Sequence, residues 1–277
     1  MGWSDRIGIR GSGFRTRDSG FAWRDSGFGI RVAADAVLSV LFAPACAACG
    51  RVLDAPTEGP VCAACWADVS PLVPPLCDAC GDPLPSWRVL SVECSLCPRC
   101  RRAPRVVDRS RAAGEYEGRL RDIIHAFKYD SRTSLAGPLG AMLREAGDEV
   151  LHDASCAIPV PLHPWRRVRR GFNQARVLAL RLDLPVVHAL WRMHATVPQS
   201  GLTAVERRRN VREVFMLSPR MRIRTARARW LQDRCVVLVD DVRTTGATLD
   251  ACATVLKRAG VREVRALTIA RAATPRR

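Results

Sequence analysis

The second half of the chain alternates between apolar residues at helical spacing and continuous apolar runs. Helical spacing predicts helices over residues 118–129, 135–150, 172–182 and 248–259. Apolar runs predict buried strands over residues 154–160, 235–239 and 264–270. Strands that alternate with helices predict an α/β fold with a mostly parallel sheet and flanking helices. In such sheets ligands bind at the carboxyl ends of the strands.

The N-terminal segment has a different pattern. An Arg-x-Ser-Gly-Phe motif begins at residues 10, 17 and 24, and the segment is rich in Gly and Ser. It lacks the paired apolar positions of a coiled coil, so we predict a disordered tail over residues 1–32. A short apolar helix is expected over residues 33–42, before Pro44 and the first cysteine.

Nothing in the sequence predicts membrane insertion. A membrane-spanning helix needs roughly 20 apolar residues, and the best candidate, residues 32–45, is shorter and contains Asp35. The first thirty residues lack the apolar core of a secretory signal. We therefore expect a cytoplasmic protein whose cysteines are thiols or metal ligands.

Four C-x-x-C pairs follow one another between residues 46 and 100. Two such pairs supply the tetrahedral four-sulfur shell of a structural zinc site. The spacers favour pairing of the first with the second and the third with the fourth, although crossed pairing stays open. Cys94 is an alternative to Cys100, and we treat it as a spare. The expected ligands of two structural Zn²⁺ ions are Cys46, Cys49, Cys62, Cys65, Cys77, Cys80, Cys97 and Cys100.

The other cysteines and the net charge are less specific. Cys156, Cys235 and Cys252 lie in strand or helix patterns, so we expect buried small apolar residues rather than nucleophiles. A net charge of +17 attracts polyanions, either nucleic acid or a phosphorylated small molecule. Arginine supplies nearly all of the positive charge, and we favour a compositional habit of the source genome over a dedicated phosphate surface as its explanation.

Residues 235–249 are the most informative stretch. A buried strand ends in two carboxylates, Asp240 and Asp241, and a Thr-Thr-Gly-Ala-Thr segment leads into a helix. Backbone N–H groups, threonine hydroxyls and the positive end of a helix dipole suit a phosphate, and adjacent carboxylates suit vicinal hydroxyls. The alternative is that the carboxylates cap a turn and that Thr248 N-caps the helix.

This stretch resembles the phosphoribosyltransferase signature. The resemblance implies that Asp240 and Asp241 bind ribose hydroxyls and that the residues after them bind the 5′-phosphate of phosphoribosyl pyrophosphate. It also implies Mg²⁺ held mainly by the sugar pyrophosphate itself. The binding residues implied are Asp240, Asp241, Arg243, Thr244, Thr245, Gly246, Ala247 and Thr248.

Further segments narrow the resemblance. Residues 124–129, 159–174 and 192–215, with the cysteine pairs, look like the competence protein F (ComF/GntX-like) family over residues 33–271. That resemblance implies a type I phosphoribosyltransferase-like domain over residues 105–277, preceded by a short helix and a double zinc ribbon over residues 33–104. The N-terminal repeats, Trp165 and Cys94 depart from the usual family pattern.

Within this picture the turn after Val160 would face the pyrophosphate, which favours arginine. Our candidates are Arg166 and Arg170, with Lys128 as a further phosphate contact. Residues 192–210 would form a lid that excludes water. The lid would supply Gln199, Arg207 and Asn210 as polar contacts.

The sequence supports two functions. The first is transfer of the phosphoribosyl group to an acceptor, with electrostatic stabilisation of the charge that develops on the sugar. The second rests on the resemblance, which implies a link to DNA uptake for some family members: a non-catalytic factor whose zinc ribbons contact single-stranded DNA or a helicase-like partner. Base stacking would need exposed aromatic residues, and the ribbons offer only Trp66 and Trp87.

Overall fold

The chain forms two compact units that are not contiguous in sequence. The computed structural model describes residues 34–38, 42–84, 95–129, 132–162, 168, 170–193, 214–222 and 229–272. One unit comprises Met1–Ser70 and Glu117–Leu135, and the other comprises Pro71–Tyr116 and Ala136–Arg277. The first and second halves of the cysteine segment therefore belong to different units. The predicted tail over residues 1–32 lies outside the described residues.

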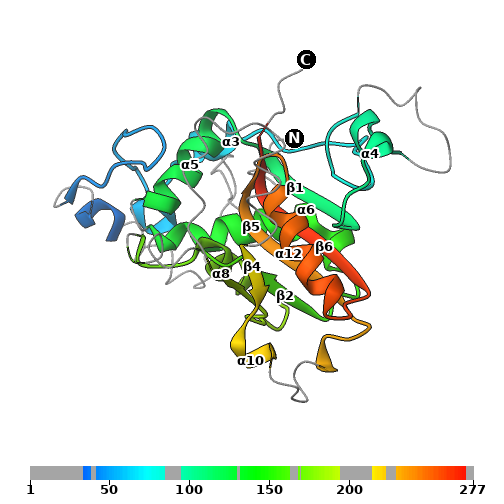
Figure 1. Cartoon of the computed structure of the whole chain (residues 1–277). Coiled ribbons are helices and arrows are strands. Elements are labelled where there is room, and N and C mark those ends of the chain that lie inside the picture. Colours follow the sequence, from blue (N-terminus) through cyan, green and yellow to red (C-terminus); the bar gives the residue numbers. More distant parts are fainter. Residues whose placement is uncertain are drawn as a thin grey trace, which may run out of the picture. The chain divides into compact units, whose positions relative to one another are not determined.

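A four-stranded parallel sheet organises the larger unit (Figure 1). The strand order is β1-β6-β5-β2, so the strand that leads into the threonine-rich segment is central. The predicted mostly parallel sheet is confirmed. The strands are β1 (Arg109–Glu115), β2 (Cys156–Pro159), β5 (Cys235–Arg243) and β6 (Glu263–Arg271).

Strand β5 is buried on both faces, which explains its unbroken run of apolar residues. Val236 and Leu238 belong to the core on one face, and the alternation of side chains directs Val237 and Val239 to the other. The strand extends beyond the predicted end at Val239, because Asp240 pairs with Thr268 of β6 and Arg243 pairs with Arg271. The two carboxylates therefore belong to the last residues of the strand rather than to the loop after it.

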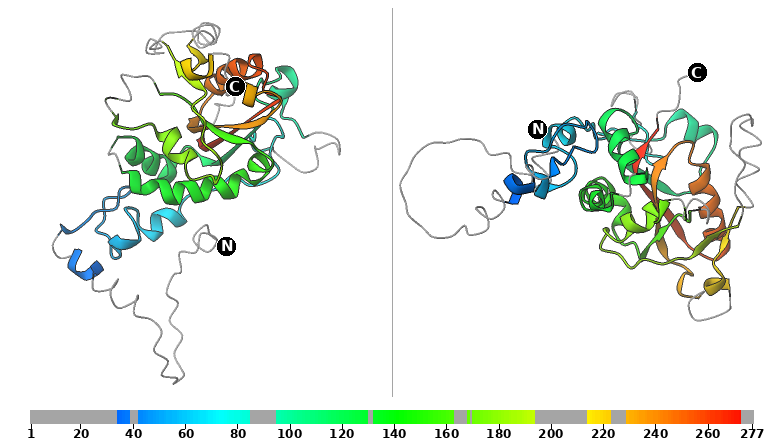
Figure 2. Two further views of the ribbon diagram at one scale, coloured as in Figure 1. Left: turned by 90° about the horizontal axis from the view of Figure 1, so that it is seen from below. Right: turned by 90° about the vertical axis from the view of Figure 1, so that its left-hand side faces the viewer.

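Helices cover both faces of this sheet (Figure 2). Helices α6 (Ala136–Leu151) and α8 (Gln174–Ala179) lie on one face, and α12 (Ala247–Arg258) lies on the other. All three were predicted, with bounds that differ by one to three residues. Leu249, Cys252 and Leu256 of α12 contribute to the core that includes Val236 and Leu238.

Three strands were not predicted. Strand β1 has the sequence Arg-Ser-Arg-Ala-Ala-Gly-Glu, whose charges conceal the fact that Ser110–Gly114 is buried. The short strands β3 (Leu190–Arg192) and β4 (Phe215–Leu217) pair antiparallel, with the Arg192 guanidinium 5.5 Å from the centre of the Phe215 ring. Helix α10 (Pro219–Arg222) follows.

The smaller unit contains short elements and one longer helix. Residues 34–38 are helical, in agreement with the predicted helix over 33–42. The carboxylate of Asp35 accepts hydrogen bonds from Thr57 N at 2.8 Å and Thr57 Oγ1 at 3.0 Å. The remaining elements are η1 (Pro56–Glu58), α3 (Ala63–Ala67), α5 (Gly118–Tyr129), which was predicted with these bounds, and η3 (Thr133–Leu135).

The lengths and apolar content of the helices bear on membrane insertion. Among the helices that the structure describes, none has both the length and the apolar character required to cross a bilayer.

Candidate functional site

The site is built where β5 passes into α12 (Figure 1). Asp240 and Asp241 are half-buried near the carboxyl end of the strand, and Asp241 N donates to Asp240 Oδ1 at 2.9 Å. Their side chains diverge to opposite faces of the sheet because successive strand residues alternate. Two carboxylates therefore flank the strand end on which a parallel sheet of this kind binds ligands.

The β5–α12 loop, residues Thr244–Gly246, exposes both threonine side chains to solvent. Gly246 is the N-cap of α12 and adopts the left-handed conformation, with φ +80°. Thr248, the alternative N-cap, instead lies in the first turn of the helix, so that interpretation is wrong. Thr245 Oγ1 accepts from Ala247 N at 3.4 Å. The loop thus combines hydroxyl groups with the positive end of a twelve-residue helix.

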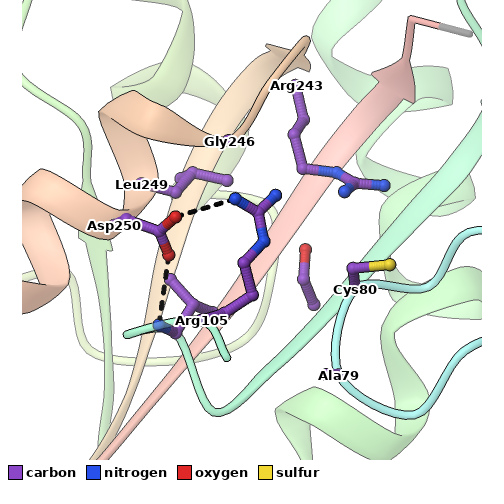
Figure 3. Close-up of a pocket in the computed structure, with 9 residues that line it drawn as sticks. Ala79, Cys80, Arg105, Arg243, Gly246, Leu249 and Asp250 are labelled. Atoms are coloured by element: carbon purple, nitrogen blue, oxygen red, sulfur yellow. Dashed lines mark hydrogen bonds and ion pairs between the residues drawn. The ribbon is translucent and has the colours of Figure 1, made fainter. Parts of the chain in front are cut away.

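The segment that carries the second pair of C-x-x-C motifs contacts this loop (Figure 3). Helix α4 (Pro98–Arg102) supplies Arg99, whose Nη2 donates to the carbonyl oxygen of Thr245 at 2.7 Å. Arg105 Nη2 donates to the same oxygen at 2.8 Å. Its Nη1 donates to Asp250 Oδ2 of α12, also at 2.8 Å. A small pocket beneath these contacts is lined by Ala79, Cys80, Arg105, Val107, Ser110, Arg243, Gly246, Leu249 and Asp250.

Arg243 also faces the second cysteine segment. Its side chain is almost fully buried, and its Nη2 donates to Asp82 Oδ1 at 2.7 Å. Arg271 approaches the same carboxylate oxygen at 3.4 Å. Burial of Asp82 opposes ionisation, yet the charges of Arg243 and then Arg271 hold the pKa of Asp82 below its ordinary value. The contacts of Arg99, Arg105 and Asp82 were missed from sequence because no local pattern signals them.

The other residues predicted at the site are placed as follows. Arg170 is partly buried and donates from Nη1 to Gln174 Oε1 at 3.4 Å, next to the start of α8. Lys128 lies in the last turn of α5, in the smaller unit. Both stay predictions as phosphate contacts. Outside the described residues lie Arg166, Gln199, Arg207 and Asn210, together with Cys94 and Trp87.

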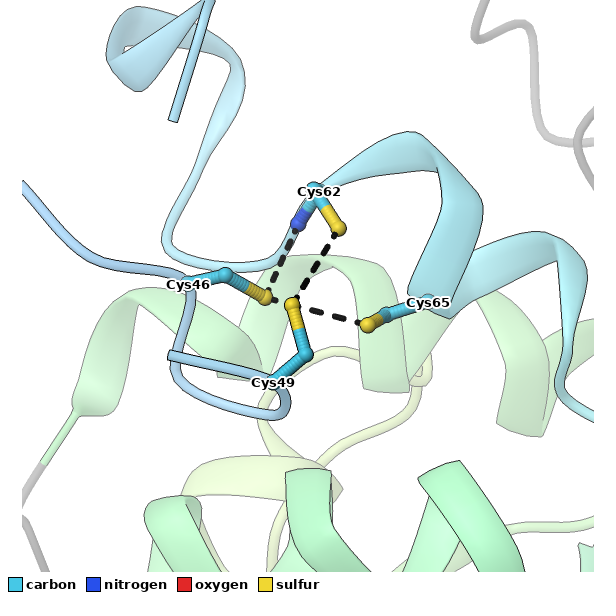
Figure 4. A group of neighbouring side chains, drawn as sticks. All are labelled: Cys46, Cys49, Cys62 and Cys65. Carbon is cyan, nitrogen blue, oxygen red and sulfur yellow. Dashed lines mark hydrogen bonds between the residues drawn. The ribbon is translucent and has the colours of Figure 1, made fainter. Parts of the chain in front are cut away.

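The first cysteine cluster lies in the smaller unit (Figure 4). Cys46 and Cys65 have sulfurs 3.9 Å apart, as do Cys49 and Cys62. A tetrahedral zinc ion with Zn–S bonds of about 2.3 Å places its sulfurs about 3.8 Å apart, whereas a disulfide requires about 2.05 Å. The cluster fits a zinc ion and does not fit a disulfide.

The second cluster lies in the larger unit and repeats this arrangement. Cys80 and Cys97 have sulfurs 3.7 Å apart, and Cys97 N donates to Cys77 Sγ at 3.3 Å. The thiol of Cys80 and nearby backbone N–H groups lower the pKa of Cys77 to about 4, which favours the thiolate that binds metal. Within each cluster, Cys46–Cys65 and Cys77–Cys100, the four sulfurs lie within 4.8 Å of one another. Sequential pairing of the motifs is confirmed.

The remaining described cysteines are apolar core residues. Cys156, Cys235 and Cys252 are at most 2% exposed. Burial raises the pKa of Cys156 to about 12 and that of Cys235 to about 11, so both stay protonated at neutral pH. The expectation of small buried residues is confirmed.

Family models match both parts of the chain. A double zinc ribbon domain matches residues 37–101, and a phosphoribosyl transferase domain matches residues 168–277. These matches confirm the predicted combination of a cysteine-rich zinc-ribbon segment and an α/β domain of the phosphoribosyltransferase type.

Whole proteins with similar sequences were also found. Competence protein F of Haemophilus influenzae is 31% identical over 222 residues, which cover 76% of this chain and 90% of that protein. DNA utilization protein YhgH of Escherichia coli K12 is 30% identical, covering 72% and 93% of the two chains. Competence protein ComFC of Bacillus subtilis is 26% identical, covering 72% and 79%. Among solved structures, glutamine phosphoribosylpyrophosphate amidotransferase of B. subtilis is 20% identical, with a TM-score of 0.34 over 52% of this chain and 30% of that one.

Proposed function

Because the chain belongs to the competence protein F family, we propose that its phosphoribosyltransferase-type domain binds phosphoribosyl pyrophosphate with Mg²⁺. The observation that carries this proposal is the strand end itself. Asp240 and Asp241 lie near the carboxyl end of β5, and a few residues later the left-handed Gly246 is the N-cap of α12. A ribose diol and a phosphate on the same ligand would engage both features.

The 5′-phosphate is assigned to the β5–α12 loop. Exposed hydroxyls of Thr244 and Thr245 and the first N–H groups of α12 are donors of the kind that hold phosphate oxygens. The ribose hydroxyls are assigned to Asp240 and Asp241, since carboxylates accept from hydroxyl donors. Mg²⁺ would neutralise charge on the pyrophosphate, and the sugar pyrophosphate would supply most of its ligands.

The proposal extends to group transfer. An acceptor nucleophile would form a bond to the anomeric carbon, the bond from that carbon to the pyrophosphate oxygen would break, and the acceptor would lose a proton. The role of this chain in such a step is electrostatic, through donors preorganised around the phosphates. Arg166, Arg170, Lys128 and the lid residues Gln199, Arg207 and Asn210 remain our candidates for further polar contacts.

A titration calorimetry experiment tests the binding site. We expect zinc-loaded protein to bind phosphoribosyl pyrophosphate with Mg²⁺, and we expect the double variant Asp240→Asn/Asp241→Asn to lose that binding. A matched control, Asp148→Asn/Asp153→Asn, makes the same change of charge at two exposed carboxylates. Equal affinity in wild type and the site variant would refute the proposed site. An equal loss of affinity in the control would show that the site variant lost binding through its change in net charge.

A second function is favoured by a specific surface. Helix α4 exposes Arg101 and Arg102, and Arg109 is exposed nearby in sequence. Basic side chains of this kind bind a phosphate backbone. Base stacking has less support, because Trp66 is buried at 6% exposure. We therefore propose single-stranded DNA contact through charge. One of the relatives carries the name DNA utilization protein.

Salt dependence tests this second function. Binding of a fluorescent oligothymidylate should weaken steeply with added salt, and the variant Arg101→Gln/Arg102→Gln should lower both the affinity and the slope. Binding that is independent of salt, or unchanged in the variant, would argue against it.

A further inference from the structure

We propose that Arg99 and Arg105 are positioning residues that set the orientation of the Thr245–Gly246 peptide for a 5′-phosphate, an inference that rests on the proposed function. Both guanidinium groups donate to one acceptor, the carbonyl oxygen of Thr245, at 2.7 and 2.8 Å. Neither residue belongs to the β5–α12 loop, and both come from the segment of the second cysteine cluster.

The geometry of the peptide bond gives this contact its effect. A planar trans peptide directs its C=O and its N–H in opposite directions. With the Thr245 oxygen held on the side of the arginines, the N–H of Gly246 is directed to the other side of the loop. Gly246 has φ +80°, and a glycine can adopt several other backbone conformations as readily. Hydrogen bonds from the two arginines to the preceding carbonyl therefore restrict the backbone of Gly246 to fewer conformations.

Charge adds to orientation. A carbonyl that accepts two charge-assisted hydrogen bonds is polarised, and this strengthens the N–H of the same peptide as a donor. The two guanidinium groups also place positive charge close to the loop. The phosphate-facing N–H would therefore be both fixed in direction and stronger than in an isolated loop.

Both terminal nitrogens of the Arg105 guanidinium are held, Nη2 by the Thr245 carbonyl oxygen and Nη1 by Asp250. Figure 3 shows the contact with Asp250. Arg105 Nη1 bonds to Asp250 Oδ2 at 2.8 Å, and Asp250 Oδ1 accepts from Val106 N and Val107 N at 3.3 and 3.4 Å. The Arg105 side chain is 14% exposed. Since Asp250 lies in the first turn of α12, Arg105 ties the loop carbonyl to the helix that follows it.

Arg99 is held by the cluster. It lies between Cys97, which N-caps α4, and Cys100, which is buried within that helix. A zinc ion bound by the four sulfurs would fix this short helix, and so the direction in which Arg99 extends. The second cluster therefore supports the loop through Arg99, in addition to stabilising its own ribbon.

The experiment separates the two phosphate-bearing parts of the ligand. Calorimetric titrations of ribose 5-phosphate and of inorganic pyrophosphate with Mg²⁺ are run on the zinc-loaded full chain and on Arg99→Gln and Arg105→Gln. We expect each variant to bind ribose 5-phosphate about tenfold more weakly, the effect of one lost charged hydrogen bond, and to keep its affinity for pyrophosphate. The control Arg258→Gln removes the same charge from an exposed position at the end of α12 and should bind both probes as wild type does.

The outcomes are distinct. Wild-type affinity for ribose 5-phosphate in both variants, or an equal loss for both probes, would overturn the positioning role while leaving the proposed function intact. A loss in Arg258→Gln that matches the others would also overturn it, because the effect would then be one of general charge. Absence of ribose 5-phosphate and phosphoribosyl pyrophosphate binding in wild type would overturn the proposed function and this inference together. Arg105→Gln also breaks the contact with Asp250, so Arg99→Gln is the decisive variant if the other is unstable.

Discussion

Arg243 Nη2 and Asp82 Oδ1 are joined at 2.7 Å, although 161 residues separate them in sequence. The contact connects the end of the central strand with the second cysteine ribbon. Arg243 is 4% exposed, and Asp82 is the partner that compensates its buried charge. Removal of a single partner from a buried ion pair leaves an uncompensated charge, which is far more costly than loss of a surface pair.

Replacement of Asp82 by Asn should therefore lower the free energy of unfolding by about 3 kcal/mol, measured by urea denaturation. Asp68→Asn is the matched control, because Asp68 is 70% exposed and lies 3.5 Å from Arg119. That change should cost at most about 0.5 kcal/mol. Equal effects in the two variants would contradict the buried role of Asp82.

The same pair should depend on pH. The folded-state pKa of Asp82 is depressed, so its contribution is present above the ordinary carboxyl pKa and is lost as the pH falls through the folded-state value. The difference in unfolding free energy between wild type and Asp82→Asn should thus narrow as the pH falls below about 4. A difference that is constant from neutral to acidic pH would show that the charge of Asp82 plays no part.

The cysteine clusters give a prediction on metal content. Wild type should bind two zinc ions per chain, and Cys46→Ser and Cys77→Ser should each retain one, because each cluster supplies four ligands to one ion. Elemental analysis of the purified proteins measures this directly. Cys94→Ser and Cys156→Ala are the controls and should retain two, and a loss of zinc in Cys94→Ser would assign Cys94 as a ligand.

Gly246 tests the tightness of the loop. A Cβ at this position would lie 2.4 Å from Arg105 Nη2, in addition to the cost of the left-handed conformation. Gly171 has φ +74° and open space around its Cβ position, so it shares only the conformational cost. We expect Gly171→Ala to lose about 1 kcal/mol of unfolding free energy and Gly246→Ala to lose at least 1 kcal/mol more. Similar losses would mean that Arg105 moves away freely.

Gly147 tests the contact of α6 with the sheet. A Cβ there would lie 2.6 Å from Leu267 Cδ2 of β6, so Gly147→Ala should destabilise the fold by about 1–3 kcal/mol despite the better helix propensity of alanine. Leu267→Ala removes the obstructing methyl groups. In a double-mutant cycle the combined variant should be more stable than the sum of the single effects, by about 1 kcal/mol or more. Additive effects would contradict the steric explanation.

Local patterns predicted much of this structure. The apolar runs of β5 and β6, the spacing of α5 and α6, and the cysteine pairs all reflect residues close in sequence. Strand β1 was missed because its buried Arg111 looks like a surface charge, whereas it donates to Glu149 Oε2 and to the carbonyl oxygens of Cys77 and Asp78. The positions of Asp240 and Asp241 near a strand end, and of the loop before the next helix, were predicted from residues 235–249 alone.

Other parts of the site depended on residues far apart in sequence. The two side-chain hydrogen bonds to Thr245 O come from residues at least 140 positions away. The chain has 44 basic residues, and no local pattern distinguishes the arginines that make these contacts. The start of α12 after Gly246, rather than after Thr248, was decided by the left-handed backbone, which the sequence Thr-Thr-Gly-Ala-Thr does not specify by itself. Such features arise from tertiary packing rather than from periodicity.

The two cysteine ribbons have similar sequence motifs, but they belong to different structural units. Backbone hydrogen bonds join the second to strand β1: Ser110 N donates to Ala79 O at 2.8 Å, and Leu72 N donates to Ala113 O at 3.2 Å. A fragment cut between the ribbon and β1 would leave Arg243 buried without its carboxylate and would leave β1 without this neighbour. Two similar motifs thus belong to two different units, and the second one is part of the unit that contains the sheet.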